Sequence, residues 1–328
     1  MLYRKLGGTG IDISTVGFGA WAIGGWMWGG TDEQQATQAI QAALDQGINL
    51  IDTAPVYGFG RSEEIVGRAI AGRREKVVLA TKCGLIWDRE EGQFFFHADR
   101  FGAASGPSEM KIYRCLRPAS IRAELEASLR RLETDYVDLY QTHWQDPTTP
   151  IAQTMEVLVK LKEEGKIRAI GVSNATLDHL KAYGPIDADQ ERYSLLERAI
   201  QSGGSLDYCR RQKISVLAYS PLDNGLLTGK IRPDREYGRG DLRKTNPRFR
   251  PAAVQQTNAM LEGIRSIAER RGVSIAQVVI AWTISQPGIT TALCGAHNPQ
   301  QAAENAAAAQ VSLTPEEIRT IGETVRAV

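Results

Sequence analysis

The sequence predicts an α/β fold, a (β/α)8 TIM barrel, and two observations support this prediction. Short apolar segments alternate with helical segments along most of the 328 residues, and such alternation indicates a parallel sheet. Eight strand-then-helix units follow from Thr15 without a break in composition, and eight units close a barrel. We therefore expect one domain over residues 1–328, with an N-terminal β-hairpin before the barrel and an appended C-terminal helix after it.

Local patterns predict each element in turn. The segment from Leu2 to Ile13 predicts a small hairpin around Gly-Gly-Thr-Gly. Thr31 is the expected N-cap of the first helix, and Thr314 starts the C-terminal helix. Strand patterns occur at residues 15–19, 48–52, 77–82, 136–142, 167–172, 186–190, 214–219 and 289–294. Helical patterns occur at residues 31–47, 62–71, 118–132, 151–164, 176–182, 195–212, 252–271, 275–285 and 300–309.

A doubly wound open sheet is the alternative fold. It would place a G-x-G-x-x-G segment after the first strand. The nearest segments, Gly17-Phe18-Gly19 and Gly58-Phe59-Gly60, both lack the third glycine. The barrel is therefore the favoured fold, with two long loops at residues 84–117 and 222–251.

Composition narrows the class of protein. Lys plus Arg (39) nearly balance Asp plus Glu (38), for a formal charge of +1, which argues against broad binding to nucleic acid or to an anionic membrane. The four cysteines form no C-x-x-C pair and the four histidines share no ligand spacing, so we expect neither a disulfide framework nor a metal site. The N-terminus has no apolar signal core, and we expect a cytoplasmic protein.

One segment, Ile48–Gly58, suggests chemistry. Its strand ends at Asp52, and Tyr57 lies in the loop that follows. Taken alone, Asp52 could cap the next turn and Tyr57 could be a packed aromatic. In a barrel, however, active sites form at the C-terminal ends of the strands, where Lys82 and His143 also lie.

These four residues suit proton transfer. A phenol with a pKa of about 10 is a poor acid at neutral pH. A neighbouring ammonium such as Lys82 lowers that pKa, and a carboxylate such as Asp52 holds the ammonium in place. His143 could donate a hydrogen bond to a substrate oxygen. Singly, Asp52 and Lys82 could be a structural ion pair and His143 a buried structural histidine; together, the set favours a catalytic site.

The chain resembles the aldo-keto reductase superfamily from Tyr3 to about Asn305. The resemblance rests on motifs that recur in order at successive strand ends: Gly17-Phe18-Gly19, Ile51-Asp52-Thr53-Ala54 with Tyr57-Gly58 and Ser62-Glu63, Thr81-Lys82, Asp138-Leu139-Tyr140 with His143-Trp144, and Tyr219-Ser220-Pro221-Leu222. The segments Gly165–Asn174 and Gly225–Lys230 are similar to those of the bacterial branch and of potassium-channel β-subunit-like members.

The resemblance implies a barrel that binds nicotinamide dinucleotide without a Rossmann domain. It implies that Tyr57 is the general acid, that Lys82 paired with Asp52 lowers its pKa, and that His143 orients the carbonyl. It further implies that the carboxamide is bound by Ser173, Asn174 and Gln190, the ring by Tyr219, the pyrophosphate by Ser220, Leu222 and Gly295, and adenine by Glu304 and Asn305. The rest of the implied cofactor set is Gly19, Ala20, Trp21, Asp52, Pro221, Gly225, Leu227, Lys230, His297 and Gln301. The implied substrate contacts are Trp21, Tyr57, Trp87, His143 and Trp144.

The choice of dinucleotide depends on the segment after the last strand. His297 stands where related bacterial members often have arginine, and Gln301 where others have a second one. A neutral histidine binds a 2′-phosphate more weakly than an arginine does. We expect NADP(H) as the cofactor, with NAD(H) as the open alternative.

The expected function is an NAD(P)H-dependent oxidoreductase that reduces aldehydes or ketones and can run in reverse as an alcohol or sugar dehydrogenase. Aromatic residues of loop 84–117, with Trp21, Trp26, Trp28 and Trp144, suit sugar, polyol or cyclic carbonyl substrates; alternatively, the loop aromatics pack on one another. The six arginines of loop 222–251 could clasp the cofactor phosphates or belong to a solvated loop. A cofactor-binding regulatory subunit is the alternative function, and the oligomeric state stays open.

Overall fold

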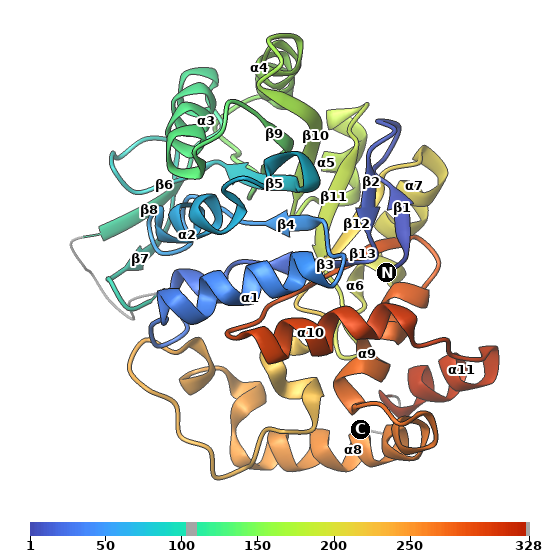
Figure 1. Cartoon of the computed structure of the whole chain (residues 1–328). Helices are drawn as coiled ribbons and strands as arrows, with labels where there is room; N and C mark the ends of the chain where they lie inside the picture. Colours follow the sequence, from blue (N-terminus) through green and yellow to red (C-terminus); the bar gives the residue numbers. More distant parts are fainter. Residues whose placement is uncertain (103–109, 326–328) are drawn as a thin grey trace.

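The computed structural model describes residues 1–102 and 110–325, and its centre is a closed barrel (Figure 1). The strands are hydrogen-bonded in the order β10-β11-β12-β13-β3-β4-β5-β9, and all pairs are parallel. Their bounds are β3 (Val16–Gly19), β4 (Leu50–Asp52), β5 (Val78–Cys83), β9 (Val137–Thr142), β10 (Ile167–Ser173), β11 (Ala188–Arg192), β12 (Ser215–Tyr219) and β13 (Ile289–Cys294). The predicted (β/α)8 barrel is confirmed.

Helices surround the barrel and connect successive strands (Figure 1). They are α1 (Glu33–Asp45), α2 (Arg61–Ile70), α3 (Pro118–Leu132), α4 (Ile151–Glu163), α5 (Leu177–Tyr183), α6 (Ala199–Ser202), α7 (Ser205–Gln212), α8 (Pro251–Arg271), α9 (Ile275–Ser285), α10 (Pro299–Ala307) and the C-terminal α11 (Pro315–Thr324).

Two helix predictions need correction. The single helix expected over residues 195–212 is two helices, because Gly203 and Gly204 separate α6 from α7 and Gly204 has a φ of +81°, which favours glycine. The N-cap of α1 is Asp32 rather than Thr31, since the Asp32 carboxylate accepts a hydrogen bond from the backbone N of Gln35 at 3.0 Å.

The predicted hairpin, β1 (Tyr3–Lys5) with β2 (Asp12–Ser14), closes the N-terminal end of the barrel. Its buried Leu6 and Ile13 join an apolar layer inside the barrel that includes Leu50, Leu139 and Leu217. Because the apolar side chains of the hairpin pack against those of the strands, water is excluded from the N-terminal end of the barrel. The opposite end of the barrel is therefore the one that stays open for a site.

The predicted loop 84–117 contains a small antiparallel sheet, which the sequence reading missed. Strand β8 (Met110–Arg114) pairs with both β6 (Leu85–Ile86) and β7 (Gln93–Ala98). Residues 103–109 of this loop lie outside the described residues. Phe95 and Phe96 of β7 pack in the apolar cluster that includes Trp26 and Val56 of the barrel mouth, whereas Phe94 is exposed.

Loop 222–251 carries three short 3-10 helices, Asp223–Thr228, Leu242–Lys244 and Pro247–Phe249. Its start and end are tied together by the buried carboxylate of Asp223, which bonds Arg248 at 3.0 Å and Arg192 of β11 at 2.6 Å. The loop is thus fixed to the barrel by charge-assisted bonds.

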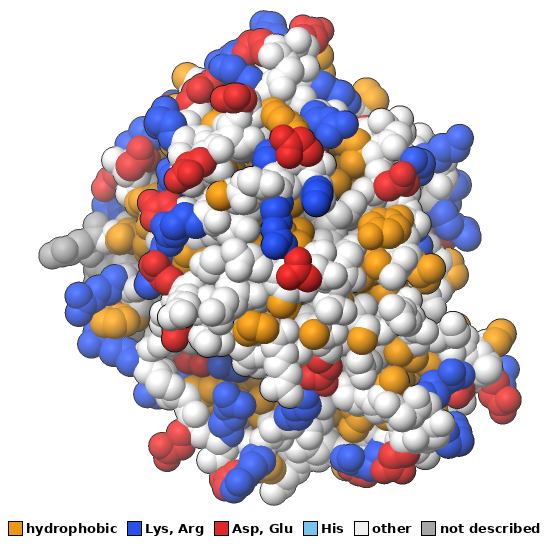
Figure 2. All heavy atoms as spheres, viewed as in Figure 1, with side chains coloured by type: hydrophobic (Ala, Val, Ile, Leu, Met, Phe, Trp, Pro, Cys, Tyr) orange, Lys and Arg blue, Asp and Glu red, His pale blue; other side chains and the backbone are white. Residues whose placement is uncertain are grey.

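Acidic and basic side chains are interspersed on the face drawn in Figure 2, and neither sign gathers there into one patch. Within the described residues, no helix combines the length and apolar character needed to cross a membrane. The same residues hold no cluster of three or more His, Cys, Asp or Glu side chains suited to a metal ion.

Candidate active site

The inside of the barrel changes from apolar to polar near the C-terminal ends of the strands. Side chains two residues apart in a strand point the same way. Two positions after each inward-facing apolar residue, the next inward-facing residue therefore lies closer to the mouth of the barrel. Four strands make the change to a polar residue at this step: Leu50 to Asp52, Ala80 to Lys82, Leu139 to Gln141, and Ala188 to Gln190. The barrel therefore carries a polar layer directly beneath its open mouth.

Lys82 is the centre of this layer. Its side chain is fully buried, and its Nζ donates to Asp52 Oδ2 at 2.7 Å and to the Thr53 carbonyl at 2.9 Å. Nζ also lies 3.3 Å from the Tyr57 hydroxyl. Burial lowers the pKa of Lys82 and the Asp52 charge opposes that shift, because an ion pair stabilises the ammonium.

Tyr57 corrects one expectation. Its pKa lies well above the usual value, because burial disfavours the phenolate and the Asp52 charge disfavours it further. We expected Lys82 to lower this pKa. Asp52 lies close enough to Lys82 to compensate its charge, so burial decides the direction. Tyr57 therefore holds its proton at neutral pH, at the open end of the polar layer.

The loop that carries Tyr57 is held by backbone contacts. Gly58 has a φ of +70°, and a Cβ added there would lie 2.4 Å from the Gly24 carbonyl oxygen, so only glycine fits. The Pro55 carbonyl accepts a hydrogen bond from the backbone N of Gly60 at 2.7 Å, which closes the turn. These contacts fix the direction of the Tyr57 ring.

His143 faces the Tyr57 ring edge-on, with ring centroids 5.6 Å apart and an interplanar angle of 84°. Burial, followed by the charge of Lys82, lowers the pKa of His143 well below its usual value, so the imidazole is neutral. Asn174 holds the backbone beneath it by donating to the His143 carbonyl at 2.9 Å.

Gln141 belongs to the site and was missed by the sequence reading. Its Nε2 donates to Asp52 Oδ1 at 3.1 Å, and Gln190 Nε2 donates to the same oxygen at 2.8 Å. A signal was available in the spacing, because Gln141 lies two residues after Leu139 and so faces the same side of the strand, and a buried amide requires a polar partner.

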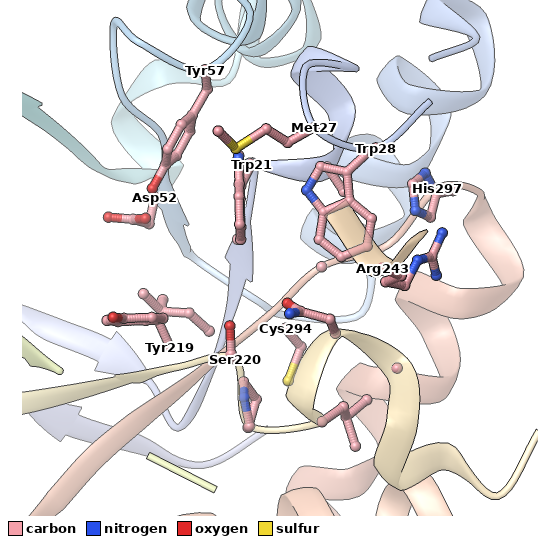
Figure 3. A pocket seen from close by; sticks show the side chains of 18 of the residues that line it. Trp21, Met27, Trp28, Asp52, Tyr57, Tyr219, Ser220, Arg243, Cys294 and His297 are labelled. Carbon is pink, nitrogen blue, oxygen red and sulfur yellow. The ribbon is translucent and has the colours of Figure 1, made fainter. Parts of the chain in front are cut away.

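A cavity of about 580 Å³ opens above the polar layer (Figure 3). It brings together most of the predicted site residues: Gly19, Trp21, Asp52, Tyr57, His143, Trp144, Ser173, Asn174, Gln190, Tyr219, Ser220, Pro221, Leu222, Gly225, Lys230, Gly295, His297, Gln301, Glu304 and Asn305. These residues come from the ends of strands and from the loops that follow them, as expected for a barrel site.

Four predicted residues do not line the cavity. Lys82 lies beneath it and reaches it through Tyr57. Ala20 and Leu227 are fully buried. Trp87 packs edge-on against Phe59, with ring centroids 5.3 Å apart, and does not line the cavity.

The cavity has chemically distinct ends. A row of rings, Tyr57, Trp21, Trp28 and His297, crosses it with successive centroid distances of 6.1, 5.4 and 5.8 Å. At the Tyr57 end the walls include Trp26, Phe95, Phe96 and Trp144. At the His297 end they include the cations Lys230, Arg235 and Arg243. The sequence reading had assigned Lys230 to the cofactor site and had left open whether the arginines of loop 222–251 reach it.

The residues between these ends fit a nicotinamide dinucleotide. The Tyr219 hydroxyl donates to Asn174 Oδ1 at 2.8 Å, which fixes the ring of Tyr219 at the cavity wall (Figure 3). Gly295 brings backbone to the wall without a side chain, and its carbonyl accepts from Asn305 Nδ2 at 3.0 Å. The cations at one end of the cavity suit the phosphates of the dinucleotide. The aromatic walls and the proton donor at the other end suit the nicotinamide ring and a substrate carbonyl.

Comparisons with known proteins agree with this geometry. The sequence profile of the Aldo/keto reductase family matches residues 15–326. Two curated relatives are the aldo-keto reductase YhdN of Bacillus subtilis, 44% identical over 92% of this chain and 86% of its own length, and the NADH-specific methylglyoxal reductase of Escherichia coli, 42% identical over 98% of both chains.

Two solved structures are similar to this chain over nearly its whole length. A glycerol dehydrogenase from Gluconobacter oxydans is 40% identical, with a TM-score of 0.86 and coverage of 99% of this chain and 95% of that one. An aldo-keto reductase from Klebsiella pneumoniae in complex with NADPH is 28% identical, with a TM-score of 0.71 and coverage of 98% and 94%.

Proposed function

This chain belongs to the aldo/keto reductase family, and from that premise we propose that it reduces aldehydes and ketones with a nicotinamide dinucleotide, with Tyr57 as general acid. The observation that carries the proposal is the buried contact set Asp52–Lys82–Tyr57, with His143 beside it, at the floor of a cavity open to solvent. Run in reverse, the same groups support alcohol oxidation.

Tyr57 supplies the proton in this proposal. A high pKa keeps the phenol protonated in the resting protein, so it can donate a hydrogen bond to a carbonyl oxygen and transfer the proton as negative charge develops there. Lys82, 3.3 Å from the Tyr57 hydroxyl, then stabilises the phenolate by charge-assisted hydrogen bonding. Asp52 keeps the ammonium in place throughout.

His143 orients the substrate. Because its imidazole is neutral, one ring nitrogen carries a proton and can donate to the carbonyl oxygen without giving that proton away. Two donors, Tyr57 and His143, then fix the direction of the carbonyl, which is the positioning that such reactions need.

The bound dinucleotide would supply the hydride. The residues proposed to hold its nicotinamide are Ser173, Asn174, Gln190 and Tyr219, and those proposed along its phosphates and adenosine are Ser220, Leu222, Gly295, Glu304 and Asn305, all of which line the cavity. Both NADP(H) and NAD(H) are used among the similar proteins, since one is described with NADPH and another as NADH-specific.

We propose uncharged aldehydes and ketones as the substrates. The cavity wall near Tyr57 is aromatic, with Trp21, Phe95 and Trp144, and its cations lie at the other end. Relatives named for methylglyoxal and glycerol make these two compounds the first to assay, followed by cyclic and aromatic carbonyls.

The test measures dinucleotide oxidation by the wild-type protein and by Tyr57→Phe with this substrate panel. The wild type should turn over at least one carbonyl, and Tyr57→Phe should lower kcat about 10²–10⁴-fold with unchanged dinucleotide affinity. A Tyr57→Phe variant with near-normal kcat would contradict the assigned role. Dinucleotide binding without turnover of any carbonyl would instead support a regulatory, cofactor-sensing role.

A further inference from the structure

The basic end of the cavity contains an ion pair with no role in the proton-transfer chemistry. Arg243 donates to Asp241 through Nε at 2.9 Å and through Nη2 at 2.6 Å. Both side chains are nearly buried, with exposures of 12% and 7%. Such a two-pronged pair uses the same face of the guanidinium that would bind a phosphate.

Neighbouring groups fix this pair over the cavity. The Arg243 guanidinium lies over the rings of Trp28 and Tyr237, at 5.0 and 4.8 Å from their centroids. The backbone N of Leu242 donates to the Met27 carbonyl at 3.0 Å, which ties the loop of Arg243 to the loop of Trp28. Figure 3 shows Arg243 beside His297, at the opposite side of the cavity from Tyr57 and Asp52.

Two of the other groups at this end, Lys230 and His297, offer less to a phosphate, whereas Arg235 is the rival to Arg243. Lys230 is already paired with Glu304 at 2.9 Å. Burial, followed by the charge of Arg243, lowers the pKa of His297, so this residue is neutral at neutral pH. Arg235 also lines the cavity, and among the described residues it has no ion pair but lies 5.4 Å from the Tyr237 ring centroid.

We propose that Arg243 recognises the 2′-phosphate of NADP(H) and that Asp241 competes with the phosphate for it, so that this pair sets the preference between NADP(H) and NAD(H). The inference rests on the proposed function, because the proton donor at the Tyr57 end places the nicotinamide there and the adenosine at the Arg243 end. A 2′-phosphate must displace Asp241 from the guanidinium and approach its carboxylate, whereas a 2′-hydroxyl need not.

Asparagine is the informative substitution at position 241. The Asp241 carboxylate also accepts from the backbone N of Arg243 at 3.0 Å as the N-cap of a short helix, and asparagine caps equally well. Asp241→Asn therefore removes the charge and keeps the turn. A matched control exists in the same loop, since Asp234 forms a similar two-pronged pair with Arg232, exposed to solvent and away from the cavity wall.

The experiment titrates the full-length protein with NADPH and with NADH and follows quenching of tryptophan fluorescence, which needs no turnover. Trp21 and Trp28 line the cavity, so both ligands should report. Asp241→Asn should raise the ratio Kd(NADH)/Kd(NADPH) about tenfold, Asp234→Asn should leave it unchanged, and Arg243→Gln added to Asp241→Asn should abolish the gain.

An unchanged Kd(NADH)/Kd(NADPH) ratio in Asp241→Asn would overturn the inference. A raised ratio that persists when Arg243→Gln is added would also overturn it, and would assign the phosphate to Arg235. Arg243→Gln alone gives an independent test, with NADPH affinity falling about tenfold and NADH affinity held; an equal loss for both would also overturn it. Failure of the wild type to bind either dinucleotide would instead mark the failure of the proposed function.

Discussion

Two ion pairs, Lys82–Asp52 and Arg243–Asp241, lie at opposite ends of one cavity, and different parts of the fold hold them in place. Lys82 and Asp52 come from adjacent barrel strands, β5 and β4, whose register brings them together at 2.7 Å. Arg243 and Asp241 are two residues apart in one turn. Their place over the cavity depends on the contact of Leu242 with Met27. The first pair is fixed by the barrel, and the second by one loop meeting another.

The difference bears on function. A pair inside the barrel cannot separate without opening the core, so Lys82 stays beside Tyr57. A pair within one turn can exchange its partner for a ligand group at small cost to the fold. We therefore assign chemistry to the first pair and ligand choice to the second.

Breaking the first pair should give the largest effect. Lys82→Met leaves Asp52 buried without its cation and should lower the free energy of unfolding by about 3–5 kcal/mol, with loss of turnover as well. The matched substitution Lys5→Met breaks an exposed pair with Asp12 and should cost less than about 1 kcal/mol. Urea unfolding measures both, and equal losses would show that the Lys82 pair contributes only as a surface pair does.

A third buried carboxyl, Glu124, forms no ion pair with any residue that the structure describes, and it sharpens the comparison. Burial raises the pKa of Glu124 to about 7, while its oxygens accept from Gly84 N and Ser120 Oγ at 2.9 and 3.0 Å. Because the folded state holds the Glu124 proton more tightly than the unfolded state, this proton stabilises the fold. The stabilisation is complete at a pH below 4.5, the pKa of the carboxyl in the unfolded chain, and it is lost as the pH rises through about 7.

Glu124→Gln should remove this loss, which amounts to about 3 kcal/mol for a shift of this size. Between pH 5 and pH 8, the free energy of unfolding should therefore fall less for Glu124→Gln than for the wild type. Glu126→Gln, on the exposed side of the same helix, is the control. Parallel pH profiles for all three proteins would show that Glu124 does not titrate in this range.

The smallest effect is expected at His297. His297→Arg adds a permanent cation beside Arg243 and should raise the affinity for NADPH relative to NADH by about three- to tenfold. Fluorescence titration with both dinucleotides measures the ratio. A ratio that stays at the wild-type value would place the 2′-phosphate out of reach of residue 297.

These regions also differ in how far the sequence predicts them. Asp52, Lys82 and His143 could be brought together from sequence, because the C-terminal ends of parallel strands meet at one end of a barrel. Gln141 was missed although its spacing from Leu139 was visible, because Asp138 and Gln141 lie on opposite faces of the strand and only the register tells which face points inward. Trp87 was assigned to the substrate wall from its loop alone, and the structure places it against Phe59 and outside the cavity lining.

Sequence reasoning could not tell which arginines reach the other end of the cavity. Arg235 and Arg243 are two of six arginines in loop 222–251, and nothing in the local pattern separates them from Arg232 or Arg239. Their position follows from contacts with distant loops, such as that of Leu242 with Met27. The direction of the Tyr57 pKa was also wrong from sequence, because the balance between burial and Lys82 depends on geometry.

The most direct test is a crystal structure of the protein with bound dinucleotide. The account predicts the nicotinamide ring on the face of Tyr219, close to the Tyr57 hydroxyl, and the adenosine ribose beside Arg243. A dinucleotide bound in the reverse direction, or bound outside this cavity, would contradict the assignment of chemistry to one end and ligand choice to the other.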